Sequence, residues 1–314
     1  MRPGVGMVTL AVGAFGSAIS ISVYAITISP HKEGCAPMER PTDPVKLKAQ
    51  IAYNSASYHF DDEPLAFWAR IGSRTVERLA LPTGARVLDV GCGTGASAIP
   101  AATAVGPTGL VIGADLADRL LDRAREKARQ QGLFNVEFRQ GDMEDLGYRH
   151  GSFDAVVSVF SVFFVPDMTK QVAELWRMVK PGGQLAITTW GRRAFEPAAT
   201  AFWAAVKEHA PPALHFGGFN PWDRVTTIEA LRDLLIGADV PDPKVEAEAS
   251  QQSLRTVDDW WTIVIGSGFV WTVEQMGAEA AKRVREDNLN SLRARAVTFV
   301  ETNVIYAAAR KASA

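Results

Sequence analysis

The stretch Val87-Leu88-Asp89-Val90-Gly91-Cys92-Gly93-Thr94-Gly95 decides the fold of this 314-residue chain. Residues 86–90 have the apolar pattern of a short buried strand, and they run directly into a glycine-rich turn and a small-residue helix over 96–104. The three glycines let the backbone turn sharply, and they let a ligand approach without meeting a Cβ atom. We therefore expect a ligand at the carboxyl end of this strand; a tight connection without a ligand is the alternative.

Strand and helix patterns alternate beyond this turn. The predicted strands lie over 110–114, 136–139, 153–159 and 184–189, and the predicted helices over 118–131 and 169–179. Alternation of this kind produces right-handed βαβ units and a parallel sheet that helices cover on both faces. The sequence therefore predicts an α/β fold.

Two flanking regions have a different character. On the N-terminal side a helical pattern over 46–79, interrupted by a turn at 59–64, predicts a helical cap within 38–80. After Trp190 the chain is rich in aromatic residues, proline and glycine. Beyond it we predict helices over 228–235, 258–265 and 273–293 and strands over 245–249 and 297–308. The ligand-binding domain would then span 81–314 and contain an insert at about 191–243.

Composition excludes several classes of protein. The chain is 47% hydrophobic and 22% charged, with a net charge of −2 and a pI near 6.2, which argues against a nucleic-acid partner. Its two cysteines, Cys35 and Cys92, form no disulfide framework, and no histidine or cysteine cluster has the spacing of a metal site. We expect no metal and a cytoplasmic location.

Residues 1–37 form a hydrophobic N-terminal extension with three open interpretations. Residues 3–30 carry no charged side chain, and a stretch of this length can cross a membrane as a helix. Arg2 precedes it and Lys32 follows it, as around a signal peptide or an anchor. Alternatively, Met38 is the true start and the extension is an artefact, or the segment is a soluble element. Membrane contact is expected only through residues 3–30.

A carboxylate at the end of the second predicted strand supports a nucleoside ligand. Asp115 closes the segment Val111-Ile112-Gly113-Ala114-Asp115. A carboxylate in this position can accept hydrogen bonds from both ribose hydroxyls of an adenosine. It can also cap the helix that begins near Asp118, and the two roles are compatible.

Three further segments separate the candidate families. Gly141-Asp142-Met143 follows the third strand, Phe153-Asp154-Ala155-Val156-Val157-Ser158 begins the fourth, and Val179-Lys180-Pro181-Gly182-Gly183 leads into the fifth. Together with the glycine-rich turn, their order and spacing resemble the class I S-adenosylmethionine-dependent methyltransferases. Within that superfamily the chain is similar to the small-molecule branch that includes the ubiquinone and menaquinone biosynthesis C-methyltransferases. The resemblance covers about residues 50 to 190.

This resemblance implies a fold and a cofactor. The fold is a Rossmann-like, doubly wound, mostly parallel seven-stranded sheet with an antiparallel last strand and a helical, aromatic insert after strand five. The cofactor is S-adenosyl-L-methionine. The residues implied to surround it are, from its methionine end to its adenine, Asp89, Gly91, Cys92, Gly93, Thr94, Gly95, Ser158, Val159, Phe160, Asp115, Leu116, Met143 and Asp142.

Each group has an implied role. The glycine loop and Asp89 hold the methionine end, while residues 158–160 border the sulfur that carries the methyl group. Asp115 binds the ribose, Leu116 and the Met143 backbone pack on the adenine, and Asp142 accepts from the adenine amino group. Asp142 as a surface turn residue and Met143 as core packing are the alternatives.

The acceptor pocket is expected at the carboxyl edge of the sheet, roofed by the N-terminal helices and the insert. His59 is the candidate general base and His215 a weaker one; each has a structural role as its alternative. The candidate lining residues are aromatic, with core packing as their alternative: Tyr58, Phe163, Phe164, Trp190, Trp203 and Trp222. Phe163 and Phe164 stand where relatives often carry a polar or histidine pair, which favours an apolar acceptor.

The leading prediction is methyl transfer to a small, apolar or lipid-like acceptor. A non-catalytic protein that binds S-adenosylmethionine is the alternative from another class. An NAD-dependent oxidoreductase is a further alternative, but the turn reads Gly-x-Gly-x-Gly rather than the Gly-x-Gly-x-x-Gly of the dinucleotide fingerprint.

Overall fold

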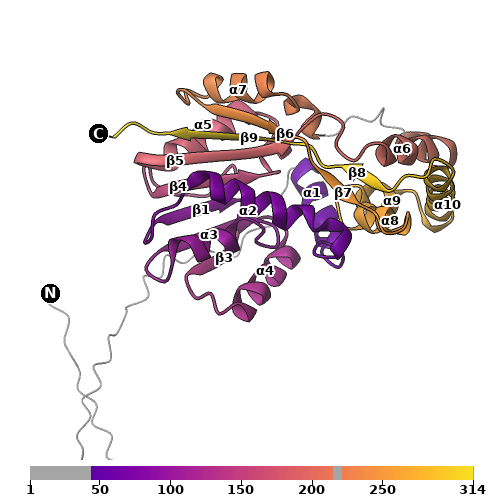
Figure 1. Cartoon of the computed structure of the whole chain (residues 1–314), viewed down its shortest axis with the longest axis horizontal. Coiled ribbons are helices and arrows are strands. Elements are labelled where there is room, and N and C mark those ends of the chain that lie inside the picture. The colour runs from indigo at the N-terminus through magenta and orange to yellow at the C-terminus, as the bar shows by residue number, and fades with distance from the viewer. Residues whose placement is uncertain (1–43, 215–220, 314) are drawn as a thin grey trace, which may run out of the picture. The chain divides into compact units, whose positions relative to one another are not determined.

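A computed structural model describes residues 44–214 and 221–313 (Figure 1). The predicted extension 1–37 and His215 lie outside these ranges, so their interpretations stay predictions. Within the described ranges, no helix combines the length and the apolar character that crossing a membrane requires.

The main sheet has seven strands in the order β3-β2-β1-β4-β5-β9-β6. Their bounds are β1 (Arg86–Val90), β2 (Leu110–Asp115), β3 (Val136–Gln140), β4 (Phe153–Val159), β5 (Val179–Trp190), β6 (Lys244–Glu248) and β9 (Val304–Arg310). β9 runs antiparallel to both of its neighbours, β5 and β6, whereas the first five strands in this order pair in parallel. The expected Rossmann-like sheet with an antiparallel last strand is confirmed.

Strand order places the edge of the sheet at which the glycine-rich turn lies. β1 lies in the middle of the sheet with β2 on one side and β4 on the other. Val87, Leu88 and Val90 are buried, as expected of a parallel strand that is covered on both faces. Because β1, β2 and β4 run in the same direction, the residues that follow them meet at one edge of the sheet.

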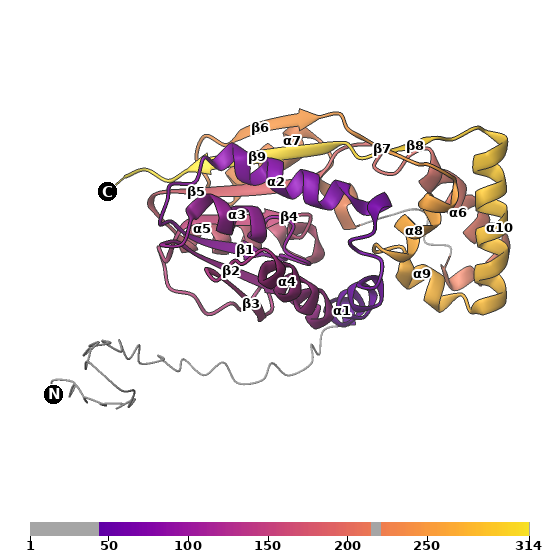
Figure 2. The same ribbon diagram turned by 60° about the horizontal axis from the view of Figure 1, so that its bottom comes forward.

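Helices cover both faces of the sheet (Figures 1 and 2). The helices of this layer are α2 (Phe67–Leu79), α3 (Ala98–Val105) and α4 (Asp118–Gln130) on one face and α5 (Met168–Met178) and α7 (Ile228–Gly237) on the other. The predicted N-terminal helical region consists of α1 (Pro44–Ala56), the 3₁₀ turn η1 (Glu63–Leu65) and α2. Short 3₁₀ turns also occur at η2 (Val162–Phe164), η3 (Pro212–Leu214) and η4 (Pro221–Val225).

A helical lobe lies beyond the ends of the strands (Figure 2). It contains α6 (Ala198–His209), α8 (Asp258–Ile265), α9 (Val270–Gln275), α10 (Ala278–Ala294) and the strand pair β7 (Gln251–Ser253) and β8 (Phe299–Glu301). α6 follows β5, whereas the other elements follow β6, and α6 packs against α10. The region predicted as an insert at about 191–243 therefore includes both α6 of the lobe and α7 of the sheet layer.

Two predicted elements are each divided in the structure. The helix expected over 273–293 is two helices, because Gly277 has a φ of 79° and interrupts the helical backbone before α10. The strand expected over 297–308 is divided into β8 and β9. β8 pairs with β7 in the lobe, and β9 pairs with β5 in the main sheet. The chain thus changes sheets at Thr302 and Asn303.

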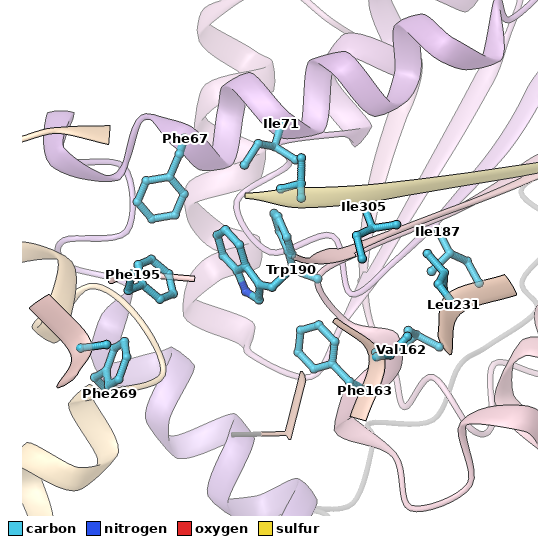
Figure 3. Packing of buried hydrophobic residues seen from close by; sticks show 14 of the residues in the cluster. Phe67, Ile71, Val162, Phe163, Ile187, Trp190, Phe195, Leu231, Phe269 and Ile305 are labelled. Carbon is cyan, nitrogen blue, oxygen red and sulfur yellow. The ribbon is translucent and has the colours of Figure 1, made fainter. Parts of the chain in front are cut away.

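An aromatic core joins the sheet to the helices around it. Trp190, the last residue of β5, is buried, with its ring centroid 5.8 Å from that of Phe67 on α2 and 4.9 Å from that of Phe195. Figure 3 shows Trp190 between Phe67 and Phe163 of η2, with Phe195 and Phe269 on the side of the lobe. Burial of several large rings at one strand end contributes strongly to stability and fixes the surrounding loops.

Candidate functional site

A pocket lies where β1, β2 and β4 end and where α1 approaches them. It encloses about 800 Å³ of empty space, open solvent at its mouth included. Its walls are formed by Ala49, Gln50, Tyr53, Phe60, Trp68, Gly91, Cys92, Gly93, Thr94, Ala96, Ser97, Asp115, Leu116, Ala117, Leu120, Met143, Val159, Phe160, Ser161 and Phe164.

The glycine loop lies tightly against the end of β4. Gly91 has a φ of 71°, and a Cβ atom added to it would lie 2.2 Å from the Cβ of Ser161. Ser161 Oγ donates a 2.7 Å hydrogen bond to the Val90 carbonyl and accepts one of 2.6 Å from Ser158. Glycine at 91 is therefore required by two independent constraints, its backbone angle and the neighbouring serine.

Asp115 lines the pocket, and its carboxylate is hydrogen-bonded to two backbone amides. Its Oδ2 accepts a 2.8 Å hydrogen bond from the Gly93 amide, and its Oδ1 accepts one of 2.9 Å from the Ala117 amide. Burial raises the pKa of this carboxyl group, although the backbone amides act in the opposite direction. Each carboxylate oxygen has a second lone pair, so Asp115 can still accept hydrogen bonds from a ligand's hydroxyl groups.

Asp89 lies buried behind the glycine loop. Its Oδ2 accepts a 2.7 Å hydrogen bond from Ser97 Oγ, whereas its Oδ1 has no hydrogen-bond partner among the described residues. Burial, reinforced by the charge of Asp115, raises the pKa of Asp89 to about 7. A buried carboxylate that lacks part of its hydrogen bonding fits a ligand with a cationic donor nearby.

Helix α1 contacts the edge of the sheet at which β1, β2 and β4 end. Three of its side chains, spaced four residues apart on one face of the helix, make these contacts. Lys46 Nζ lies 2.6 Å from Asp142 Oδ2 and 2.6 Å from Glu144 Oε2. Gln50 donates a 3.0 Å hydrogen bond to the Leu116 carbonyl. Asn54 donates to Asp118 and accepts from the Arg119 amide. α1 thereby contacts the segments that follow β2 and β3.

Aromatic rings form a further part of the pocket wall, and Phe60 lies next to Gly93 of the glycine loop. Phe60 stacks on Trp68 at 5.2 Å with an interplanar angle of 2°, and Phe160 meets Trp68 edge to face at 5.3 Å. Tyr53 approaches both Phe60 and Phe164 edge to face. Tyr53, Phe60 and Trp68 were absent from the predicted site. The helical periodicity of 46–79 marks such residues as apolar, but it does not distinguish a core position from a pocket wall.

Most of the predicted cofactor residues come together in this pocket. Those that line it are Gly91, Cys92, Gly93, Thr94, Asp115, Leu116, Met143, Val159 and Phe160. Four others lie outside its lining. Asp89 and Ser158 are buried outside the lining, and Gly95 lies against Ile99 of α3. The Asp142 carboxylate contacts Lys46 and the Glu144 amide.

The predicted acceptor residues are placed differently. Phe164 lines the pocket, but Tyr58 is 68% exposed on the surface. Phe163 and Trp190 are buried in the core, and Trp203 and Trp222 pack against it; none of the four lines the pocket. His59 Nδ1 lies 2.8 Å from Asp62 Oδ2 in the turn before η1, also outside the lining.

Comparison with known proteins identifies relatives. A family described as "Methyltransferase domain" matches residues 87–183. The aklanonic acid methyltransferase DauC of Streptomyces sp. (strain C5) is 35% identical over 199 residues, covering 59% of this chain and 90% of that relative. The demethylmenaquinone methyltransferase of Lactococcus lactis is 35% identical over 113 residues, which cover 36% of this chain and 45% of that enzyme, so this match spans less than half of its length.

The same fold occurs among solved structures. The YcgJ protein of Bacillus subtilis superposes with a TM-score of 0.52 at 19% identity, and the match covers 78% of this chain and all of that chain. This likeness shows the fold alone.

Proposed function

The chain belongs to the class I S-adenosylmethionine-dependent methyltransferases, and on that premise we propose that it methylates a small apolar molecule by in-line displacement. One observation carries the proposal: the glycine loop and Asp115 share a single pocket with a wall of aromatic side chains. The polar part of that pocket suits the cofactor, and the aromatic part suits the acceptor.

The residues around the glycine loop fit the cofactor. When bound, S-adenosylmethionine supplies a methyl group already activated on a sulfonium. Asp115 accepts hydrogen bonds from the ribose hydroxyls, and Leu116 and Met143 pack against the adenine. The buried Asp89 carboxylate lies outside the pocket lining, so it complements the ammonium of the methionine end across the glycine loop and not by direct contact. Each contact uses a hydrogen-bonding capacity or an apolar surface that the described residues leave available.

An apolar acceptor follows from the composition of the pocket wall. Among the described lining residues, Asp115 is the only one of a type that is ordinarily charged at neutral pH, and its oxygens already contact backbone amides. A strongly charged acceptor would therefore lose its hydration without gaining an oppositely charged partner. The names of the relatives DauC and demethylmenaquinone methyltransferase, which specify an organic acid and a quinone, support a small organic acceptor.

The chain contributes to transfer mainly through alignment and the exclusion of water. Phe160 and Phe164 enclose the acceptor beside the glycine loop, where the acceptor atom can lie opposite the departing sulfur. Burial raises the pKa of the Tyr53 phenol, so this group stays protonated and can donate a hydrogen bond but does not act as a base. His59, the candidate base, contacts Asp62 outside the lining, and the proposal assigns it no proton transfer.

The test uses the full chain and S-adenosylmethionine labelled in its methyl group. A cell extract is divided into an organic-solvent fraction and an aqueous fraction, and each is incubated with the enzyme. We expect label to enter molecules of the organic fraction, with an equal amount of S-adenosylhomocysteine released. Incorporation confined to the aqueous fraction would refute an apolar acceptor. A Gly91→Ala variant, which should not hold the cofactor, is the background control.

A further inference from the structure

Helix α2 contains a glycine that the helix itself does not require. Gly72 is buried near the middle of α2, and it is not among the glycines with positive φ. Glycine in a helix interior lowers stability relative to alanine, because it loses more backbone freedom on folding. The reason for glycine at this position therefore lies outside the helix.

The backbone that follows the glycine loop lies directly against Gly72. A Cβ atom at Gly72 would lie 2.5 Å from the Ala96 carbonyl carbon and closer still to the Ala96 carbonyl oxygen. Both are backbone atoms, so no rotation of a side chain can relieve the overlap. Ala96 lines the pocket, whereas Gly72 does not. Gly72 thus contacts, from outside the lining, a residue whose position shapes the pocket.

A proline leaves the Ala96 carbonyl free to approach α2. The carbonyl of the preceding residue, Gly95, accepts a 3.0 Å hydrogen bond from the amide of Ile99, four residues further along. The corresponding donor for the Ala96 carbonyl would be the amide of residue 100, but Pro100 has no N–H. The Ala96 carbonyl is therefore not drawn into the hydrogen bonding of α3, and it lies against α2 at Gly72.

Helix α2 is joined to two strands of the main sheet. Thr75 and Thr188 of β5 share a 2.8 Å hydrogen bond between their hydroxyl groups, and both residues are buried. Arg78 donates a 3.0 Å hydrogen bond to Glu248 of β6. A side chain introduced at Gly72 should consequently displace the segment after the glycine loop rather than α2.

The displaced segment belongs to the part of the pocket that the proposed function assigns to the methionine end of the cofactor. Ser97 follows Ala96, lines the pocket and donates a 2.7 Å hydrogen bond to Asp89. Asp115, the proposed ribose contact, is held by two backbone amides at other positions. A displacement at Ala96 therefore reaches the surroundings of Asp89 before those of Asp115.

We propose that Gly72 is a positioning residue, which lets Ala96 and Ser97 lie close enough to α2 for the pocket to hold the methionine end of S-adenosylmethionine. The inference rests on the proposed function, because the proposed function assigns this end of the pocket to the methionine portion. Alanine at position 72 moves the segment away from α2, and a small misplacement of binding groups is enough to lose their contacts with a ligand.

The test compares S-adenosylhomocysteine with 5′-methylthioadenosine, which keeps the adenosine and the sulfur but lacks the amino acid portion. Calorimetric titration of the full chain gives both affinities, and the wild type should bind S-adenosylhomocysteine more tightly. Gly72→Ala should weaken S-adenosylhomocysteine binding about 10- to 100-fold, the effect of losing charged hydrogen bonds to the amino acid portion. It should change the affinity for 5′-methylthioadenosine by less than about twofold.

Gly183→Ala is the matched control. Gly183 also lacks a positive φ, and a Cβ atom there would lie 2.7 Å from the Asp154 carbonyl oxygen, again a backbone atom. Neither residue lines the pocket. The control should lower the melting temperature but leave the ratio of the two affinities within about twofold of the wild type. The proposal is overturned if Gly72→Ala keeps the wild-type ratio, or if Gly183→Ala changes the ratio equally.

Hydrogen exchange of the wild type decides the question if Gly72→Ala does not fold. Residues 69–76 of α2 do not line the pocket, so their amides respond to a ligand only through neighbouring segments. At saturation, S-adenosylhomocysteine should slow the exchange of these amides more than 5′-methylthioadenosine does, because a filled methionine end holds Ala96 against Gly72. Equal protection by the two ligands would overturn the proposal.

Failure of the proposed function is distinguishable from failure of this inference. If labelled methyl groups enter only polar acceptors while the affinity ratio depends on Gly72, the proposed acceptor class is wrong and the role of Gly72 stands. If label enters apolar acceptors but the ratio does not depend on Gly72, the role of Gly72 is wrong. A wild type that binds the two ligands alike would contradict the proposed place of the methionine end, and this inference with it.

Discussion

Thr94 Oγ1 donates a 2.7 Å hydrogen bond to Asp61 Oδ1, which ties the glycine loop to the turn between α1 and η1. Lys127 Nζ of α4 lies 2.7 Å from the same carboxylate oxygen and 2.8 Å from Thr94 Oγ1, and Arg123 donates to Asp61 Oδ2. A single carboxylate therefore holds the N-terminal helical region, the glycine loop and α4 together.

Replacing Asp61 should lower both the stability of the protein and its affinity for S-adenosylmethionine. Asp61→Asn keeps the shape but leaves Lys127 and Arg123 without their anion, so we expect a loss of about 1–3 kcal/mol in the free energy of unfolding. Affinity for S-adenosylmethionine should fall with it, because Thr94 lines the pocket. Asp62→Asn, which affects only the half-exposed contact with His59, should cost less than about 1 kcal/mol. Equal losses in the two variants, measured by urea unfolding, would contradict this role.

The contribution of Asp61 to the free energy of unfolding should also depend on pH. Burial tends to raise its pKa, but the charge of Lys127 and hydrogen bonds from Lys127, Thr94 and Arg123 outweigh burial and hold the pKa below the ordinary value of 3.8. The stabilisation is then present above the unfolded-state pKa and is lost as the pH falls through the lower folded-state value. The difference in unfolding free energy between the wild type and Asp61→Asn should therefore shrink in acid. If this difference in unfolding free energy did not change with pH down to strongly acidic solution, the Asp61 carboxylate would not be the group responsible for the stabilisation.

Gly91 and Gly132 form a matched pair for testing the glycine loop. Both have positive φ, but a Cβ atom at Gly91 would collide with Ser161, whereas one at Gly132 would have nothing within 4 Å. We expect Gly132→Ala to cost about 1 kcal/mol with cofactor affinity intact. Gly91→Ala should cost about 2–5 kcal/mol and abolish measurable binding. Calorimetric titration and thermal unfolding check both variants; cofactor binding by Gly91→Ala would show that the loop adapts.

Asp115 should recognise the ribose of the cofactor. Asp115→Ala should lower the affinity for S-adenosylhomocysteine about 10- to 100-fold, the effect of losing charged hydrogen bonds. Because Asp115 also holds the Gly93 amide, this loss alone does not separate a ligand contact from a structural one. The 2′-deoxy analogue separates them: the wild type should bind it more weakly than the parent compound, and Asp115→Ala should bind the two alike. Unchanged discrimination in the variant would remove Asp115 from the ribose site.

Asp89 should make the ligand-free protein less stable as the pH rises. Burial is the main reason that its pKa is raised from 3.8 to about 7, so the folded protein binds a proton that the unfolded chain has already released. The stabilisation is complete below the unfolded-state pKa and is lost as the pH rises toward the folded-state value. Asp89→Asn should therefore gain unfolding free energy relative to the wild type between about pH 4 and pH 7.

A second variant tests the cause of this shift. Ser97 donates a hydrogen bond to Asp89 and thereby opposes the rise in its pKa. In Ser97→Ala the decline in stability with pH should consequently extend to higher pH than in the wild type. Parallel stability curves for the wild type and Asp89→Asn across this range would show that Asp89 does not titrate in it.

Local sequence patterns were sufficient to predict the sheet and the part of the pocket that the glycine loop and Asp115 form. The apolar run before Gly91 defines β1, the glycines define the loop, and Asp115 closes β2 as predicted. Because parallel strands end at one edge of a sheet, their order in the chain was enough to bring Gly91 and Asp115 together. Residue types and spacing determine these features through backbone angles and strand burial, which are properties of short segments.

The other side of the pocket was decided only by the tertiary structure. Tyr53, Phe60 and Trp68 precede β1, whereas Phe160 and Phe164 follow β4, and no local pattern relates the two groups. His59 and Trp190, both predicted for the acceptor site, contact Asp62 and the core instead. Hydrophobic periodicity shows which face of a segment is buried, but the partner that covers this face depends on how distant segments pack. For that reason the sequence alone determined the edge at which the glycine loop and Asp115 lie, and the packing of α1, η1 and α2 against the ends of β4 and β5 determined the aromatic wall of the pocket.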